Sequence, residues 1–207
     1  MAGRESGSAR PGLRERKKAR TRATIRSVAF RLFREQGYAE TTIEQIADEA
    51  EVSPSTFFRY FPTKEALVLA DDLDPPMIAA FERQPADVTV FDALRNAFGQ
   101  VYGNLSPEDI EFERERQRLA FSVPDLKRAA MQQMLDSIDL AAALVAHHTG
   151  RAEDDFEVRA LAGAIIGAII GAAVTNPGNL ELAMRAMGYV EDGLPLGHAS
   201  VATADGG

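Results

Sequence analysis

Apolar residues recur every three or four positions along most of the chain, which is the spacing of one face of an α-helix. The first stripe of this kind ends with Leu32 and Phe33, and Gly37 follows it as the residue that ends the helix. No stretch alternates apolar and polar residues for the length of a β-strand. The pattern therefore predicts an all-α fold.

Three short helices are predicted after this stripe from the hydroxyl residues that would cap them. Such side chains accept hydrogen bonds from the first backbone N–H groups of a helix, which otherwise lack partners. A glutamine three residues after the first cap completes a capping box, and a proline is well tolerated at the first helical position. The expected caps are Thr42 (with Gln45), Ser53 (with Pro54) and Thr63, and the third of these helices starts at Lys64.

The rest of the chain is also expected to be helical. Asp74-Pro75-Pro76 is expected to interrupt or kink it, because proline has no N–H to donate inside a helix. Both ends, residues 1–13 and 194–207, have little to bury and are expected to be disordered. Further helices are predicted at about 77–84, 89–104, 107–121, 124–149, 154–175 and 179–192.

Residues 42–61 have the layout of a helix-turn-helix. A short helix is followed by the turn 50–52 and by a second helix, with apolar positions spaced for packing against the first stripe. Helices in this arrangement present the N-terminal residues of the second helix to the DNA major groove. The apolar positions are Ile43, Ile46, Ala47, Val52, Phe57 and Phe61.

The total charge of the chain argues against a polyanionic partner, but the distribution of charge along the chain supports one. The 207 residues include 23 Lys and Arg against 31 Asp and Glu, which gives a net charge of −8. Residues 1–70 hold 13 basic and 9 acidic side chains, whereas residues 71–207 hold 10 and 22. A basic front on an acidic body indicates that the front binds a polyanion such as DNA. A solvated basic tail is the alternative explanation of the same charges.

Several other classes of protein are excluded or disfavoured. Without cysteine the chain has no disulfide, thiolate metal site or cysteine nucleophile. The acidic run 108–115 is interleaved with arginines that can pair with it, and the adjacent His147 and His148 face apart on a helix. We therefore expect no metal site, no cofactor and no enzymatic activity. The apolar run 160–174 is shorter than a membrane span of about 20 residues, so we expect a cytoplasmic protein without a membrane partner.

Residues 20–67 resemble the DNA-binding domain of the TetR family of bacterial transcriptional regulators. The resemblance lies in the order of residues in AFRLFREQGYAETTIEQIADEAEVSPSTFFRYFPTKEAL, above all Gly37, Ile46-Ala47, Tyr60-Phe61 and Lys64-Glu65-Ala66-Leu67. The C-terminal half fits the family in length and helix count. It is also similar to the subset of regulators associated with mycofactocin genes, for which acyl-CoA-like ligands are considered.

The resemblance implies that the front of the second helix of the motif faces base edges, and that Thr42, Tyr60 and Lys64 contact the DNA backbone. Helix N-termini and hydroxyls suit phosphate oxygens, and basic side chains release counterions. Arg59 is the one long donor on the base-facing side that can bind a guanine, with a phosphate contact or a free surface position as alternatives. The basic arm 14–26 is expected along phosphates and the minor groove, or else only to raise the on-rate. The expected DNA-binding residues are Arg16, Lys17, Lys18, Arg20, Thr42, Ser53, Pro54, Ser55, Thr56, Arg59, Tyr60 and Lys64.

Two residues depart from the family pattern. Glu51 stands where the family most often has glycine, at a position in the turn that usually needs a left-handed backbone. Either Glu51 accepts that conformation or the turn differs slightly. Phe58 stands where many members have tyrosine, so a hydroxyl bond to phosphate is missing. We expect Phe58 against a thymine methyl or a sugar, or in the core.

The predicted helix 154–175 has a face of small residues that allows another helix to approach closely. Packing within the chain is one interpretation. By the family resemblance, the last two helices instead form a four-helix interface in a homodimer, and such a dimer requires a palindromic operator. The interface residues are then expected to be Gly163, Ile166, Gly167, Ile170 and Gly171.

The resemblance also implies an effector site inside the C-terminal half, between helices 4 and 7 counted from the start of the chain. Phenylalanine and methionine side chains there can form an adaptable apolar pocket, although each of them alone is more often an ordinary core residue. The candidates are Phe81, Phe91, Phe98, Tyr102, Phe112, Phe121, Met131 and Met134, together with Leu94, Val101, Leu119, Leu135 and Ile138.

Together these observations predict an all-α homodimeric transcription factor. Residues 14–70 are expected to form a three-helix, helix-turn-helix DNA-binding domain, and residues 71–193 a helical domain for ligand sensing and dimerisation. The protein is expected to repress from a palindromic double-stranded DNA operator and to be released by a small, largely apolar effector. A helical dimer that binds DNA without any effector is the alternative.

Overall fold

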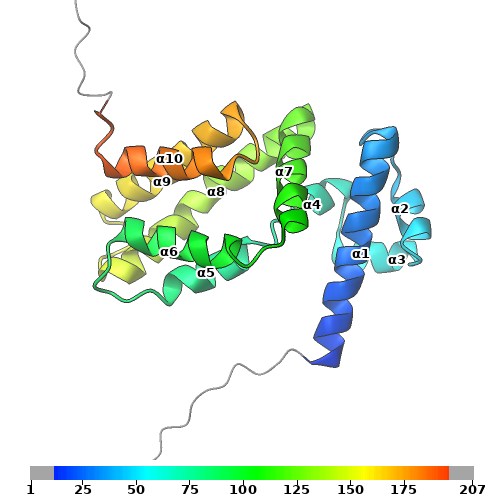
Figure 1. The fold of residues 1–207 in the computed structure, drawn as a ribbon, viewed down its shortest axis with the longest axis horizontal. Helices are drawn as coiled ribbons and strands as arrows, with labels where there is room; N and C mark the ends of the chain where they lie inside the picture. Colours follow the sequence, from blue (N-terminus) through cyan, green and yellow to red (C-terminus); the bar gives the residue numbers. More distant parts are fainter. Residues whose placement is uncertain (1–11, 196–207) are drawn as a thin grey trace, which may run out of the picture. The chain divides into compact units, whose positions relative to one another are not determined.

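The all-α fold predicted from the sequence is confirmed. Residues 12–195, which the computed structural model describes, form ten α-helices and no strand (Figure 1). The two ends expected to be disordered fall mostly outside these described residues, except that Leu13 already begins the first helix. The helices are α1 (Leu13–Gln36), α2 (Ile43–Glu49), α3 (Pro54–Tyr60), α4 (Lys64–Leu69), α5 (Asp74–Glu82), α6 (Val90–Tyr102), α7 (Pro107–Ser122), α8 (Pro124–Thr149), α9 (Phe156–Thr175) and α10 (Leu180–Glu191).

The chain divides into two compact units between Leu67 and Val68. In the N-terminal unit, α2 and α3 pack beside the C-terminal half of α1 (Figure 1). The side chains between these helices are almost completely removed from water, with exposures of 0 to 1%, because the apolar stripe of α1 meets those of the two short helices. They are Ile25, Ala29, Phe30, Ile46, Ala47, Phe57 and Phe61.

The three predicted caps are present. The Thr42 hydroxyl accepts a hydrogen bond from the Gln45 N–H while the Gln45 side chain accepts one from the Thr42 N–H, which is a complete capping box. The Ser53 hydroxyl accepts the N–H of Thr56 at 3.1 Å. The Thr63 hydroxyl accepts the N–H of Ala66 at 3.0 Å. The short helices of the motif are therefore closed by the side chains that the sequence supplies.

The two prolines near the start of the C-terminal unit do not interrupt a helix, contrary to the sequence prediction. They occupy the first turn of α5, which begins at Asp74 and not near residue 77. The first four N–H groups of a helix have no partner within the helix, so proline loses no hydrogen bond there. The interruption lies just before, in the non-helical residues 70–73.

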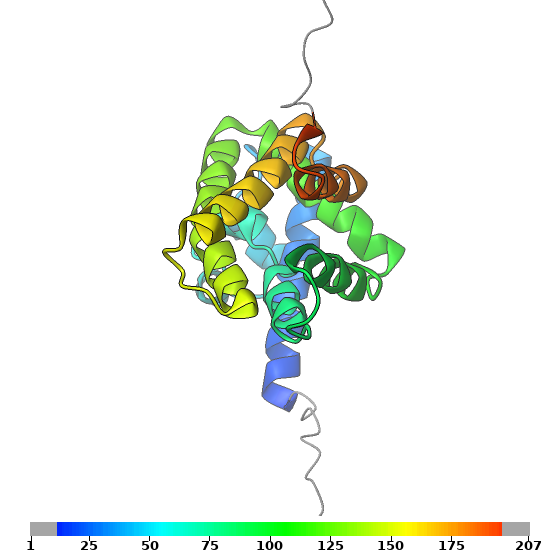
Figure 2. The ribbon, with the colours of Figure 1, turned by 90° about the vertical axis from the view of Figure 1, so that its left-hand side faces the viewer.

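The C-terminal unit is built from pairs of packed helices. Helix α9 packs against both α8 and α10, and α5 packs against α6 (Figures 1 and 2). One apolar cluster joins α5 to α6 around Phe81 and Ala97, and a second joins α8 to α9 around Val145 and Val158. The rest of the α9 surface is therefore left for other contacts.

A buried ion cluster joins the first residues of this unit to α7. The Arg116 side chain, only 5% exposed, donates to the Glu113 carboxylate at 2.6 Å and to the Asp71 carboxylate at 2.6 Å. It also lies 3.5 Å from the Val68 carbonyl oxygen. A buried arginine is tolerated when such acceptors replace its lost water. Arg116 thus fastens the segment 68–71 to α7.

The acidic groups of this cluster outnumber the basic one. Desolvation, and then the nearby Asp71 carboxylate, raise the pKa of Asp74 to about 6. Burial, together with the charges of Asp71 and Glu113, raises the pKa of Tyr102 to about 12. Arg116 is therefore the charge that makes this concentration of carboxylates tolerable.

Replacing Arg116 by methionine is expected to destabilise the C-terminal unit by about 3 kcal/mol, because it leaves Asp71 and Glu113 without their counter-ion. The matched control is Arg118→Met on the same helix, where the arginine is exposed and pairs with Glu111. That change should cost less than about 1 kcal/mol. Urea unfolding followed by circular dichroism measures both. Equal losses in the two variants would show that the buried cluster does not stabilise the unit.

Candidate DNA-binding surface

The turn between α2 and α3 is a Schellman motif with glutamate at its left-handed position. The Val52 N–H bonds the Ala47 carbonyl at 2.9 Å, the Glu51 N–H bonds the Asp48 carbonyl at 3.0 Å, and Glu51 has a φ of +53°. Of the two possibilities left by the sequence, Glu51 therefore accepts the left-handed backbone. The turn keeps its geometry at the expense of local strain.

The front of α3 carries a row of hydroxyl groups. The Ser53 oxygen lies 2.9 Å from both the Ser55 and the Thr56 hydroxyl oxygens, and Ser53, Pro54 and Ser55 are exposed. Arg59, one turn further along, is also exposed. These residues lie together at the N-terminal part of the second helix of the motif, the region that enters the major groove in proteins of this type.

The end of α3 is held by an arginine that the sequence interpretation placed only in the general basic arm. Arg22 of α1 lies 4.4 Å above the Phe61 ring, and its guanidinium approaches the Tyr60 carbonyl at 3.4 Å. Tyr60, the expected phosphate contact, is half-buried at this junction. Arg22 stands three residues before the buried Ile25, and residues with this spacing share one face of a helix. This spacing is the sequence signal that places Arg22 on the inner side of α1.

Lys64 has a structural role that the sequence interpretation did not include. Its ammonium group donates to the carbonyl oxygens of Tyr38 at 2.7 Å and Thr41 at 2.8 Å, and it lies 4.4 Å above the Tyr38 ring. It thereby fixes the turn that leads into the cap of α2. A contact of Lys64 with DNA phosphate stays a prediction.

The basic residues expected in an arm are helical. Arg16, Lys17, Lys18 and Arg20 belong to α1 and are exposed. An α-helix with its side chains is about 10 Å wide, whereas the minor groove is about 6 Å wide, so this segment cannot lie inside the groove as a helix. Contact with phosphates remains available to these side chains.

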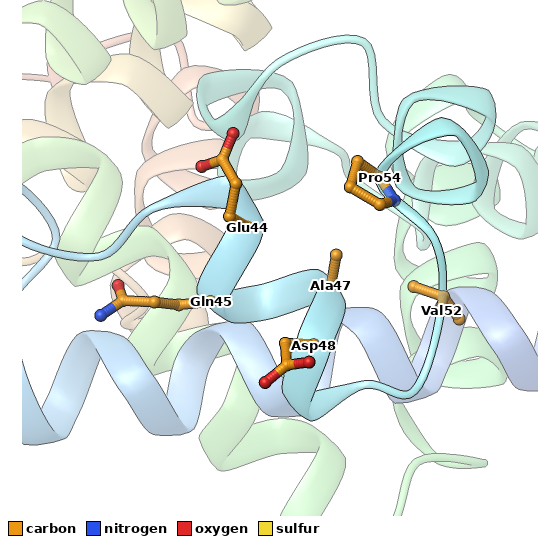
Figure 3. A pocket seen from close by; sticks show the side chains of 6 residues that line it. All are labelled: Glu44, Gln45, Ala47, Asp48, Val52 and Pro54. Atoms are coloured by element: carbon orange, nitrogen blue, oxygen red, sulfur yellow. The ribbon is translucent and has the colours of Figure 1, made fainter.

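The exposed aromatic ring of the motif and a nearby hollow complete this surface. Phe58 is 49% exposed, so of its three expected locations the core is excluded. A hollow between α2 and α3 is lined by acidic as well as neutral side chains (Figure 3). Because carboxylates repel phosphate, this hollow does not suit the DNA backbone. Its lining residues are Glu44, Gln45, Ala47, Asp48, Val52 and Pro54.

The effector candidates lie on several helices of the C-terminal unit, from α5 to α8. Phe81 is buried in the cluster of α5 and α6, with Tyr102, Leu94 and Val101 against it. Phe98 stacks on Tyr102 with ring centroids 5.8 Å apart. The others are partly buried, apart from the exposed Leu135: they are Phe91, Phe112, Leu119, Phe121, Met131, Met134 and Ile138. Which of them contact a ligand stays a prediction.

Helix α9 has an open outer face. A Cβ atom added at Gly163, Gly167 or Gly171 would meet nothing within 4 Å, and Ile166 and Ile170 are only partly buried. The most apolar stretch of 18 residues in this helix has a mean hydropathy of 1.9, and 28% of that stretch is buried. By length and composition alone it is the helix among the described residues that is apolar enough to cross a membrane. Within residues 12–195, α9 packs on α8 and α10, and the side that carries its glycines is left uncovered.

The fold and this surface define a helix-turn-helix DNA-binding protein with a helical C-terminal unit. Residues 25–70 match the family model described as bacterial regulatory proteins, tetR family, and residues 88–195 match the MftR C-terminal domain. The chain belongs to the TetR family, as the resemblance of the motif suggested. It is a DNA-binding transcriptional regulator and not an enzyme.

Two curated relatives extend over most of the chain. The HTH-type transcriptional regulator TcmR of Streptomyces glaucescens is 35% identical over 157 residues, which are 72% of this chain and 70% of TcmR. The protein described as mycofactocin biosynthesis transcriptional regulator MftR, from Mycobacterium tuberculosis, is 24% identical over 154 residues, 73% of this chain and 77% of MftR. The similarity to mycofactocin-associated regulators is thus confirmed.

Two solved structures share the fold. The TetR-family repressor FadR of Thermus thermophilus, in complex with lauroyl-CoA, has a TM-score of 0.54 and 27% identity, covering 90% of this chain and all of FadR. The SmeT–triclosan complex has a TM-score of 0.55 and 19% identity, covering 90% of this chain and 95% of SmeT. The second likeness is one of fold alone.

Replacing Glu51 by glycine is expected to stabilise the N-terminal unit by about 1 kcal/mol, because glycine adopts a positive φ without strain. Glu51→Gln is the control, since it removes the charge and keeps a side chain in the left-handed conformation. Thermal unfolding of the two variants beside the parent protein measures the difference. An equal gain from glutamine would assign the effect to charge and not to the backbone.

Arg59→Ala is expected to lower discrimination between operator and unrelated DNA, by about 1–3 kcal/mol, more than it lowers overall affinity. Lys64→Ala should weaken binding to all sequences alike. Fluorescence anisotropy over a salt series measures both, and a lost phosphate contact lowers the salt slope by about 1. If Lys64→Ala leaves the slope unchanged and lowers the melting temperature, its effect arises in the Tyr38–Thr41 turn. The reverse pattern for the two residues would contradict these assignments.

Proposed function

We propose that the protein is a cytoplasmic, ligand-responsive repressor that binds a palindromic operator as a homodimer and releases it when a small, largely apolar effector binds. The observation that carries the proposal is the uncovered face of α9. A helix this apolar gains roughly 25 cal/mol for each Å² of apolar surface that a partner removes from water. A second copy of the same face supplies that partner with closed, twofold symmetry.

Twofold symmetry has a direct consequence for the DNA. Two recognition helices α3 related by a twofold axis fit two half-sites of opposite orientation, one helical turn apart. The centres of such half-sites are separated by about 34–36 Å. The operator is therefore a palindrome, read by the hydroxyl row 53–56 and by Arg59.

An apolar effector agrees with the side chains of the C-terminal unit. The stacked pair Phe98 and Tyr102, and the partly buried Met131 and Met134, offer flexible apolar surface that a ligand can order. FadR, which shares the fold at 27% identity, was solved with lauroyl-CoA. An acyl chain has the chemistry that such side chains favour.

The segment 68–71 is a suitable route from effector to DNA. It consists of the last two residues of α4 and the two residues that follow them, and Arg116 ties it to α7 through Asp71 and the Val68 carbonyl. A ligand that binds better to one position of α7 shifts this segment, and with it the separation of the two recognition helices. Because half-site spacing is fixed, a shift of a few ångströms releases the DNA.

Selection of bound duplexes from a random pool tests the DNA-binding part of this proposal. We expect enrichment of a palindrome whose half-sites are about 10–10.5 base pairs apart. Steep salt dependence with no sequence enrichment would instead support a dimer that binds DNA without specificity. The effector part is tested on the selected operator with lauroyl-CoA, with free laurate and with CoA alone. If no probe changes operator affinity by more than about twofold, the class of effector proposed is wrong.

A further inference from the structure

Helix α10 carries a polar stripe on the side that faces away from the core. Its inward side is marked by Met187, which is 3% exposed. Glu181, Arg185 and Tyr189 follow one another at intervals of four residues, so they share one face. All three are exposed in the single chain. The stripe thus lies on the outside of the helix that packs beside α9.

Arg185 lies in surroundings that are unusual for an exposed arginine. It lines a hollow of about 400 Å³ between α9 and α10. Its neighbours there are small or apolar, namely Ala164, Ala168, Leu182, Ala186, Tyr189, Val190 and Leu194. A guanidinium at such a position needs an acceptor once the hollow is covered, because apolar walls offer none.

No acceptor for Arg185 is found among the described residues of its own chain. Other arginines of this unit have carboxylate partners, including Arg95 with Asp92, Arg128 with Asp125 and Arg159 with Asp139. Glu181 is likewise without a cationic partner in the described part, although glutamate four residues before arginine is the favourable order for a pair within a helix. Two opposite charges therefore remain open on one face.

We propose that these two charges pair across the twofold axis of the homodimer, Glu181 of each protomer with Arg185 of its partner. The inference rests on the homodimer proposed above and adds the register in which the two copies meet. Two α10 helices that cross antiparallel about an axis near residue 183 bring both pairs together at once. The face is then complementary to itself, as a twofold interface must be.

The alternative registers are electrostatically poorer. An axis at residue 185 opposes two guanidinium groups, and an axis at residue 181 opposes two carboxylates. An axis at residue 187 places Arg185 over Tyr189 of the partner subunit and leaves Glu181 unpaired. Only the axis near residue 183 satisfies both charges when water leaves the hollow. The charge pair therefore selects the register in which the two α10 helices meet. Repulsion between like charges also disfavours dimers with other helical proteins that lack this pair of charges.

Charge exchange tests the pairing. Arg185→Glu alone and Glu181→Arg alone each place like charges across the axis, and each should raise the dimer dissociation constant at least about tenfold. A mixture of the two variants restores both opposite-charge pairs, so heterodimers should predominate over either homodimer. The double variant should regain the dimer affinity of the parent protein. Sedimentation equilibrium gives the dissociation constants, and native mass spectrometry of the mixture, with one variant carrying a mass tag, gives the heterodimer fraction.

The control is Arg128→Glu, a charge reversal at an exposed residue of α8, which should leave dimer affinity unchanged. Circular dichroism confirms that each variant is folded, and high salt should reduce the differences between variants. If the parent protein is a monomer at micromolar concentration, the homodimer and the pairing are both wrong. If the parent is a dimer but the mixture forms heterodimers only in the statistical proportion, the pairing alone is wrong. Weakening by Tyr189→Ala in that second case would indicate the axis at residue 187.

Discussion

The uncovered apolar face of α9 is the constraint on which the C-terminal unit depends. Its glycines leave the helix backbone accessible, and its packing on α8 and α10 covers only the opposite side. In the proposed homodimer, the partner subunit on this face would hold α8, α9 and α10 together as one base. The Arg95–Glu191 ion pair extends that base to α6, since it joins α6 to the end of α10. The proposed effector response would then move the other helices of the unit relative to this base.

In the DNA-binding unit, side chains form hydrogen bonds with backbone N–H and C=O groups that have no partner within a helix. Side-chain hydroxyls close the N-termini of α2 and α3, and a lysine closes the turn before α2 by binding two carbonyl oxygens. These bonds hold the hydroxyl row of α3 in place beside the apolar core of the unit. Precision of this surface therefore comes from hydrogen bonds between residues close to it.

The sequence was most informative where one residue decides a local structure. Thr42, Ser53 and Thr63 predicted three helix starts correctly, because a cap is read from a few neighbouring positions. It was less informative where distant residues meet. The hydrogen bonds of Lys64 to the Tyr38 and Thr41 carbonyl oxygens join positions more than twenty residues apart. The ion pair of Arg116 with Asp71 joins positions 45 apart.

The proline pair 75–76 and the basic segment before Ile25 differ from the sequence prediction because one local pattern is compatible with two structures. Pro75 and Pro76 are unfavourable within a helix and favourable at its start, so the same residues are compatible with both a break and a beginning. The basic segment before Ile25 was treated as an arm because its charge is obvious and its helical continuity with the buried stripe is not. Which apolar residues contact an effector stays a prediction, since an apolar side chain in a pocket has the same sequence pattern as one in a core.

The first eight residues of α1 have a further consequence through the helix dipole. They are all exposed, Gly12 provides no side-chain cap, and Glu15 is the one acid in the first turn beside several bases. The N-terminus of a helix carries partial positive charge, so this concentration of cations opposes helix formation there. The phosphate contact expected of these side chains would supply the missing negative charge. DNA binding would then stabilise the first turns of α1, and any ordering of this helix end on binding would subtract from the affinity that its charges provide.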